Sequence, residues 1–123
     1  MTTNNRSALQ KVSESRLQSN CYQWAYNTYP QVRGLFFSVP NGGTRNVREA
    51  QTLKATGLTP GIPDMILLSN ATVYGFEFKS LTGRVSPTQI RIFDIWKEKG
   101  IYIHYINNEA IFKIIFDTII SAQ

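Results

Sequence analysis

The chain has 123 residues, 42% of them hydrophobic and 17% charged, which excludes a disordered polypeptide and predicts one globular domain over residues 1–123. Thirteen Lys and Arg against eight Asp and Glu give a net charge of +5 and a pI near 9.6, which favours a polyanionic partner. The longest apolar run, MILL, is too short to cross a bilayer, and the polar start lacks the apolar segment of a signal peptide, so we expect a cytoplasmic protein without a membrane partner.

Helices and strands alternate along the chain, separated by turn-forming residues. Residues 1–11 are expected to be a flexible start. In chain order, the expected elements are a helix over 13–29, a strand over 35–39, the loop PNGGTR, a helix over 46–56, the strands MILLS and VYGFEFK, a helix over 87–99, the strand IYIHYI and a helix over 109–120. Apolar residues cover most of the circumference of the last helix, so we expect the domain or a partner chain to bury it. This order predicts an α/β fold in which α-helices flank a small mixed β-sheet.

The single cysteine, Cys21, lies on the apolar stripe of the first expected helix, together with Leu17 and Trp24. A lone cysteine cannot form an internal disulfide, which agrees with a reducing compartment. A reactive thiol is the alternative, but the apolar stripe favours a packed and inert side chain.

The strand VYGFEFK carries different side chains on its two faces. Because side chains alternate along a strand, the aromatic residues Tyr74, Phe76 and Phe78 face the core. Glu77 and Lys79 then project side by side from the opposite face, at the end of the strand. Taken alone, this pair is also explained by a solvated polar face with an incidental ion pair.

Asp64 adds a second carboxylate to Glu77. It follows Gly-Ile-Pro and directly precedes the strand MILLS, which must neighbour the strand of Glu77. Across so short a hairpin Asp64 comes level with Glu77, and the two carboxylates raise each other's pKa unless a cation neutralises them. Such oxygen ligands suit Mg²⁺, and Lys79 lies close enough to orient an attacking water or to stabilise charge on a phosphate. A helix or turn cap is the alternative role for Asp64.

The stretch GIPDMILLSNATVYGFEFKS resembles the signature of the PD-(D/E)xK nuclease superfamily, with Pro63-Asp64 followed by Glu77-Phe78-Lys79. More narrowly, the chain resembles the VRR-NUC domain family, which comprises small phage and bacterial nucleases similar to Holliday-junction resolvases. The ordered stretches PNGGTR, REAQTLKATGLTPGIPD, FEFKSLTGRVSPTQ and KEKGIYIHYI carry this resemblance, which covers about residues 13–106.

The resemblance implies a restriction-endonuclease-like fold, in which a small mixed sheet is flanked by helices. It further implies a Mg²⁺-dependent DNA endonuclease, in which Mn²⁺ substitutes for Mg²⁺, with a 5′-phosphate product and a branched or four-way junction substrate. The residues that it assigns to the site are Asp64 and Glu77 as metal ligands with catalytic roles, Lys79 as the catalytic lysine, Gln89 as a positioning residue, and the carbonyl of Phe78 and the carboxylate of Glu14 as further metal ligands.

The positions of Glu14 and Gln89 on their expected helices also indicate that their side chains need partners. Glu14 lies three residues before Leu17, at the edge of the buried stripe, so its carboxylate needs a partner. A metal, Lys79, Gln18 or the dipole of the helix N-terminus are the alternatives. Gln89 is the last residue of SPTQ, which reads as a capping box, but it also shares the inward face of its helix with Ile92. A structural and a functional role are therefore both open for Gln89.

Polar, glycine and basic residues before Asp64 and after Glu77 are candidate DNA contacts. The loop PNGGTR offers backbone amides that can approach a phosphate, although the same letters also describe an ordinary turn. The helix that follows carries basic side chains that are explained equally well by a solvated face. The expected contacts are Asn41, Gly42, Gly43, Arg45, Arg48, Lys54 and Arg84. The single histidine, His104, alternates with apolar residues and is expected to be structural.

Two classes of function compete, beside a structural or assembly role that rests only on the apolar last fifteen residues and is compatible with the first class. The first is the endonuclease, for which a homodimer would bring two active sites to the two strands of a junction, with the apolar C-terminal helix as a candidate interface. The second is a non-catalytic DNA-binding module that retains the fold. Asp64, Glu77 and Lys79 are all present, which favours the endonuclease over a degenerate site.

Overall fold

The computed structural model describes residues 13–40 and 46–123. The flexible start expected over 1–11 and the expected DNA contacts Asn41, Gly42, Gly43 and Arg45 lie outside the described residues. The elements are α2 (Glu14–Thr28), the short 3₁₀-helix η1 (Pro30–Val32), β1 (Phe36–Ser38), α3 (Val47–Ala55), β2 (Met65–Ser69), β3 (Thr72–Phe78), α4 (Pro87–Glu98), β4 (Ile103–Ile106) and α5 (Glu109–Ser121). All expected helices and strands are present with small shifts of their ends, and η1 is the addition.

The four strands form a single mixed sheet in the order β1-β2-β3-β4. The pairs β1–β2 and β2–β3 are antiparallel, and the register of the central hairpin sets Met65 opposite Phe76 and Ser69 opposite Thr72. β4 lies parallel to β3 because α4 carries the chain back along the sheet before β4 begins. The predicted α/β fold with a mixed sheet between helices is confirmed.

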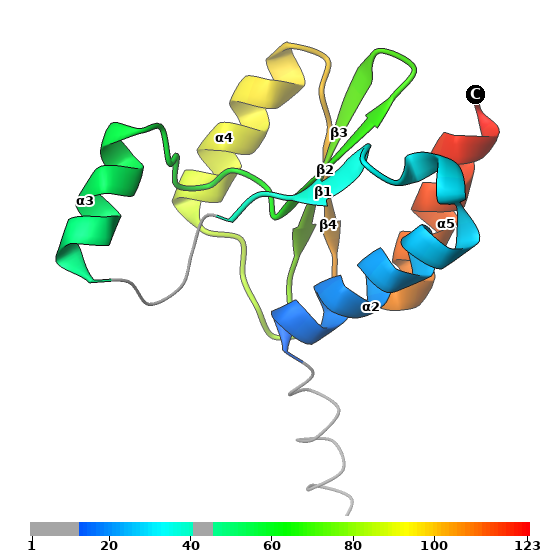
Figure 1. Ribbon diagram of the computed structural model, residues 1–123, viewed down its shortest axis with the longest axis horizontal. Coiled ribbons are helices and arrows are strands. Elements are labelled where there is room, and N and C mark those ends of the chain that lie inside the picture. Colours follow the sequence, from blue (N-terminus) through cyan, green and yellow to red (C-terminus); the bar gives the residue numbers. More distant parts are fainter. Residues whose placement is uncertain (1–12, 41–45) are drawn as a thin grey trace, which may run out of the picture.

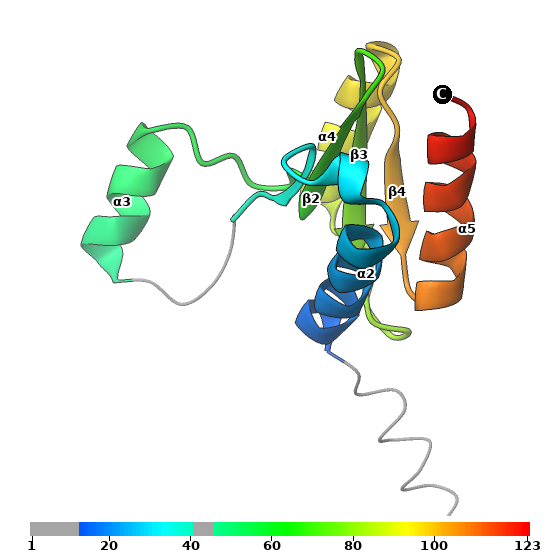
Figure 2. The same ribbon diagram turned by 45° about the vertical axis from the view of Figure 1, so that its right-hand side comes forward.

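One face of the sheet is covered by α2 and α5, which lie side by side (Figure 1, Figure 2). Inward-facing side chains of β3, including Phe76 and Phe78, meet the buried stripe of α2 and the phenylalanines of α5. Cys21 lies within this core, and burial is the main cause that raises the pKa of its thiol to about 12. The predicted packing of Cys21 in the core is therefore confirmed.

The helix α5 is buried on one side only. Phe112, Phe116 and Ile119 pack into the core, whereas Ile111 and Ile114 are 44% and 67% exposed. The domain thus buries the inner face of α5. It does not bury the apolar residues on the rest of the helix, so the expected burial by the domain alone is incomplete. The outer face leaves two isoleucines in contact with solvent.

The other face of the sheet is covered by α4, while α3 stands apart from the sheet in both views (Figure 1, Figure 2). α4 buries Ile92, and the sheet beneath it presents Ile66, Gly75 and Glu77. No residue of α3 is buried. Among the described residues, no helix is long and apolar enough to span a membrane.

Candidate active site

Asp64 and Glu77 lie side by side at the open end of the β2–β3 hairpin, away from its turn and on the face covered by α4. The register that pairs Met65 with Phe76 continues by one residue and sets Asp64 opposite Glu77. The backbone N–H of Phe78 donates to Oδ2 of Asp64 at 2.8 Å, and the Asp64 carbonyl accepts from the N–H of Val39 at 2.8 Å. Asp64 is therefore held between β1 and β3, level with Glu77 as the sequence predicts.

The two carboxyl groups are withdrawn from water and repel each other. Glu77 is only 5% exposed, and burial raises its pKa to about 7, with the charge of Asp64 as the second cause. Burial also raises the pKa of Asp64. Such shifts mean that the ionised pair lacks sufficient positive charge around it. The site therefore has the electrostatic character of one that accepts a cation.

Lys79 supplies the nearest opposite charge. Its Nζ lies 3.7 Å from Oε2 of Glu77, and its backbone N–H donates to the carbonyl of Ile106 at 2.8 Å, which fixes the chain directly after β3. The ammonium lowers the pKa of both Asp64 and Glu77, but burial outweighs it in each case. Lys79 thus lies where it can reach a group bound between the two carboxylates.

Gln89 makes two kinds of contact, one that caps its helix and one with the acidic pair, and both are compatible with its position in the sequence. Its backbone N–H donates to Oγ of Ser86 at 3.1 Å, and its Oε1 accepts from the Ser86 N–H at 3.0 Å, which completes a capping box at the start of α4. Its Nε2 donates to Oε2 of Glu77 at 2.9 Å. One side chain thus joins the N-terminus of α4 to the acidic pair.

Glu14 has a partner that sequence reasoning did not consider. Its Oε1 accepts from the backbone N–H of Ser80 at 3.3 Å, so the first turn of α2 is attached to the segment after β3. The negative charge of Glu14 also raises the pKa values of Asp64 and Glu77. In the described part of the chain, no three acidic, histidine or cysteine side chains are grouped closely enough to hold a metal together. Asp64 and Glu77 therefore form a pair, and Glu14 lies outside their immediate grouping.

Two residues that support the site were not assigned to it from the sequence. A Cβ added to Gly75 would lie 2.9 Å from Cγ of Pro63, so only glycine lets the residue before Asp64 pack closely on β3. Tyr105 on β4 pairs in register with Glu77, and burial followed by the charge of Glu77 raises its pKa. The glycine beside Glu77 was a visible signal in the sequence, whereas nothing local to Tyr105 places it beside Glu77.

The expected DNA contacts that the structure describes are exposed. Arg48 and Lys54 lie on the projecting helix α3, and Arg84 lies in the loop between β3 and α4. His104 packs against the rings of Tyr74 and Phe76, and burial lowers its pKa. The structural role predicted for His104 is thus confirmed.

The family model of the VRR-NUC domain matches residues 3–108. The chain belongs to the VRR-NUC family. A solved structure described as a VRR_NUC domain protein matches it with a TM-score of 0.70 and 17% sequence identity, covering 86% of this chain and 87% of that one. This likeness confirms the shared VRR-NUC fold, and the family places the chain among nuclease domains. No curated protein was found to match the VRR-NUC chain in sequence.

Proposed function

We propose that this VRR-NUC domain is a Mg²⁺-dependent endonuclease that hydrolyses phosphodiester bonds in DNA. The observation that carries the proposal is the pair of the buried Glu77 and the half-buried Asp64, with Lys79 Nζ only 3.7 Å from Glu77. Two neighbouring carboxyl groups with raised pKa values are unfavourable when both are ionised, and a bound cation is the ligand that would neutralise them.

The donor atoms at this site fit the proposed metal. Carboxylate oxygens are ligands of Mg²⁺, which needs only one or two of them in addition to waters and phosphate oxygens, and Mn²⁺ would substitute. We assign the metal to Asp64 and Glu77, with the carbonyl of Phe78 and the carboxylate of Glu14 as the further candidates. When bound there, Mg²⁺ supplies neutralisation of the acidic pair and polarisation of a phosphate oxygen.

Each side chain around the pair then has a distinct task. The ammonium of Lys79 orients the attacking water and stabilises the negative charge that develops on the phosphate. The Nε2 of Gln89 holds Oε2 of Glu77 at 2.9 Å and so fixes the direction of that carboxylate. Water would attack the phosphorus in line, opposite the 3′-oxygen, so that the new P–O bond forms as the P–O3′ bond breaks; the products are a 3′-hydroxyl and a 5′-phosphate.

The substrate that we propose is branched DNA, including four-way junctions, cut by a homodimer. Exposed basic side chains on α3 and before α4, Arg48, Lys54 and Arg84, would contact phosphates together with the loop residues Asn41, Gly42, Gly43 and Arg45. The described residues of one chain form one candidate active site, whereas resolving a junction needs two cuts. The exposed Ile111 and Ile114 on α5 offer a face through which two copies would associate.

Cleavage of labelled linear, flap and four-way DNA in Mg²⁺, Mn²⁺ and EDTA tests this function. Asp64→Asn and Glu77→Gln should each lower the cleavage rate by at least about 100-fold, while DNA binding stays intact or tightens because repulsion of phosphate falls. Lys79→Ala should lose turnover but retain metal binding, measured by titration.

The outcomes separate the two classes of function. Wild-type protein that binds DNA but cleaves none of the substrates would support the non-catalytic binding module instead. Substantial cleavage by Asp64→Asn or Glu77→Gln would contradict the assignment of the pair. Equal cleavage of linear and branched DNA would leave the nuclease in place and remove the preference for junctions.

A further inference from the structure

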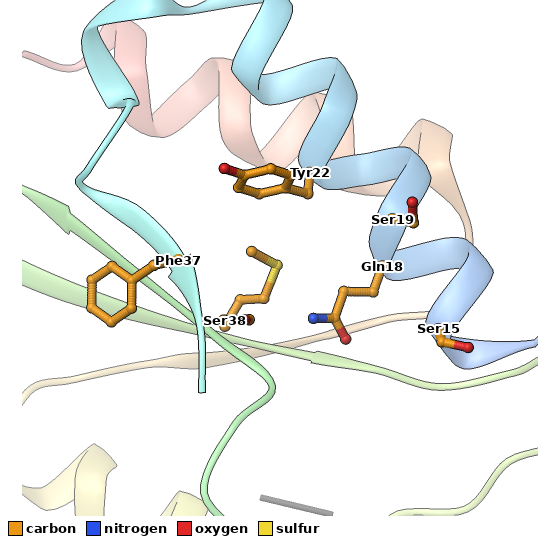
Figure 3. A pocket seen from close by; sticks show the side chains of 7 residues that line it. Ser15, Gln18, Ser19, Tyr22, Phe37 and Ser38 are labelled. Carbon is orange, nitrogen blue, oxygen red and sulfur yellow. The ribbon is translucent and has the colours of Figure 1, made fainter. Parts of the chain in front are cut away.

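A pocket of about 440 Å³ lies between α2 and the edge of the sheet at β1. Its lining residues are Ser15, Gln18, Ser19, Tyr22, Phe37, Ser38 and Met65. In Figure 3 the carboxamide of Gln18 points from α2 towards the strands, and the ring of Tyr22 lies above the pocket, while the Phe37 ring lies on the far side of β1. This volume falls within the range of small-molecule and cofactor sites in proteins.

Two side chains in this pocket offer free contact groups. Tyr22 is 37% exposed, and its ring is held from behind by Phe36 at 5.9 Å and by Tyr26 at 6.0 Å between ring centroids. The hydroxyl of Tyr22 and the carboxamide of Gln18 have no hydrogen-bond partner among the described residues. The pocket thus combines an aromatic surface with an amide that can both donate and accept.

The charge of the pocket restricts its occupant. None of the described residues that line it carries a charge, in a chain whose net charge is +5. Among these described lining residues, a phosphate would find no cation and a metal would find no anionic ligand. A flat, neutral group with polar atoms along its edge matches an aromatic ring beside a free carboxamide, and a nucleobase is such a group.

The pocket lies near the candidate active site through the first turn of α2. Ser15 directly follows Glu14, whose Oε1 accepts from the N–H of Ser80 just after β3 and whose charge acts on Asp64 and Glu77, whereas the side chain of Met65 lies on the face of the sheet opposite to that of Asp64. A DNA strand whose phosphate lies at the carboxylates therefore brings its neighbouring nucleotides to this end of the sheet. A paired base is stacked on both faces within the duplex, so only an unpaired base can present a free face and a free edge to the pocket.

We propose that this pocket binds an unpaired nucleobase next to the phosphate that is cut, stacked on Tyr22 and hydrogen-bonded to Gln18. The proposal rests on the proposed endonuclease function and deepens it, because it assigns the recognition of branched DNA to the unpaired bases near the branch. It also gives a role to side chains that neither the acidic pair nor the core requires.

The test compares two DNAs that differ only in one unpaired nucleotide beside the branch, which carries either a 2-aminopurine base or an abasic sugar. Binding is measured in EDTA by anisotropy of an end label, and stacking by quenching of 2-aminopurine fluorescence. Wild type should bind the base-carrying DNA about tenfold more tightly than the abasic DNA, as expected for one base–aromatic stack. Tyr22→Leu should remove this ratio and the quenching, while Tyr22→Phe should retain both.

Matched variants separate base recognition from folding. Tyr102→Leu removes an exposed tyrosine, 54%, that lies before β4 and does not line the pocket, and should leave the ratio unchanged. Gln18→Ala removes a half-buried amide and should lower the ratio several-fold, which decides the question even where Tyr22→Leu fails to fold.

A ratio of one in wild type, or an unchanged ratio in Tyr22→Leu and Gln18→Ala, would overturn the pocket's role. Because binding is measured without metal, failure of the two proposals can be told apart. A preserved ratio with no cleavage in Mg²⁺ or Mn²⁺ contradicts the nuclease alone, and cleavage with a ratio of one contradicts the base pocket alone.

Discussion

At the scale of single residues, the ionised form of Glu77 is unfavourable in the protein without metal. Its pKa is raised from 4.5 to about 7, first by burial and then by the charge of Asp64. The folded state therefore holds this proton more tightly than the unfolded state does. The resulting contribution to stability is fully present below about pH 4.5 and is lost as the pH rises towards 7.

We accordingly expect the melting temperature of the protein in EDTA to fall between pH 4.5 and 7.5, relative to Glu77→Gln. The variant lacks the titrating group, so its curve over this range should be flatter, and it should melt at a higher temperature than wild type above pH 7. Excess Mg²⁺ should raise the wild-type melting temperature mainly at the high end of the range. Circular dichroism at 222 nm measures these transitions. Parallel curves for the two proteins would show that Glu77 does not titrate as described.

At the scale of elements, the N-terminus of α4 combines a helix cap with support for the active site. Ser86 takes part only in the cap, whereas Gln89 caps through Oε1 and also donates to Glu77 through Nε2. Substituting the two residues separately can therefore distinguish the stability of the helix from the positioning of the carboxylate.

Ser86→Ala should lower the free energy of unfolding by about 1 kcal/mol, as is typical for loss of an N-cap, with turnover close to wild type. Gln89→Glu keeps an oxygen for the cap but replaces the donor to Glu77 with a third negative charge. It should therefore reduce kcat by about tenfold or more, at a loss of stability too small to account for this. Urea denaturation and cleavage kinetics measure the two effects. If the loss of kcat were proportional to the loss in free energy of unfolding in both variants, Gln89 would act only as a cap.

At the scale of the whole molecule, α5 joins the core to an exposed apolar face. Phe112 and Phe116 hold the helix against the sheet, while Ile111 and Ile114 face solvent. Isoleucines at a spacing of three residues lie on the same face of a helix and so form one continuous surface. Association of two copies through this surface would set two acidic pairs on one assembly.

Light scattering of wild type should give the mass of a dimer, about twice 14.0 kDa, and Ile114→Glu should give a monomer. The charge would be buried in the interface, whereas it is solvated in the free chain. Cleavage of four-way junctions should fall more than cleavage of linear DNA, because only the junction requires two coordinated cuts. Tyr102→Glu before β4, where the native side chain is 54% exposed, is the matched control. A wild-type monomer at micromolar concentration would contradict the dimer.

Local patterns in the sequence were sufficient for the elements and for the centre of the candidate site. Ser86 caps α4 as the SPTQ motif predicted, and Asn46 caps α3 in the same way, because a cap depends on residues three positions apart. The alternation along β3 placed Phe76 and Phe78 in the core, and the short hairpin brought Asp64 level with Glu77. In each case the interacting residues are close in the chain, so their sequence separation and residue types determine how they contact each other.

Only the tertiary structure decided the contacts between distant segments. Glu14 meets the N–H of Ser80 across 66 positions of sequence, and Tyr105 reaches Glu77 only because β4 pairs in parallel with β3. The pocket at Tyr22 likewise exists because α2 packs over the edge of β1. Hydrophobic burial drives these segments together, and many packings satisfy the same apolar pattern. The spacing of residues therefore determined which side chains share a face, while the packing of helices against the sheet determined which faces meet.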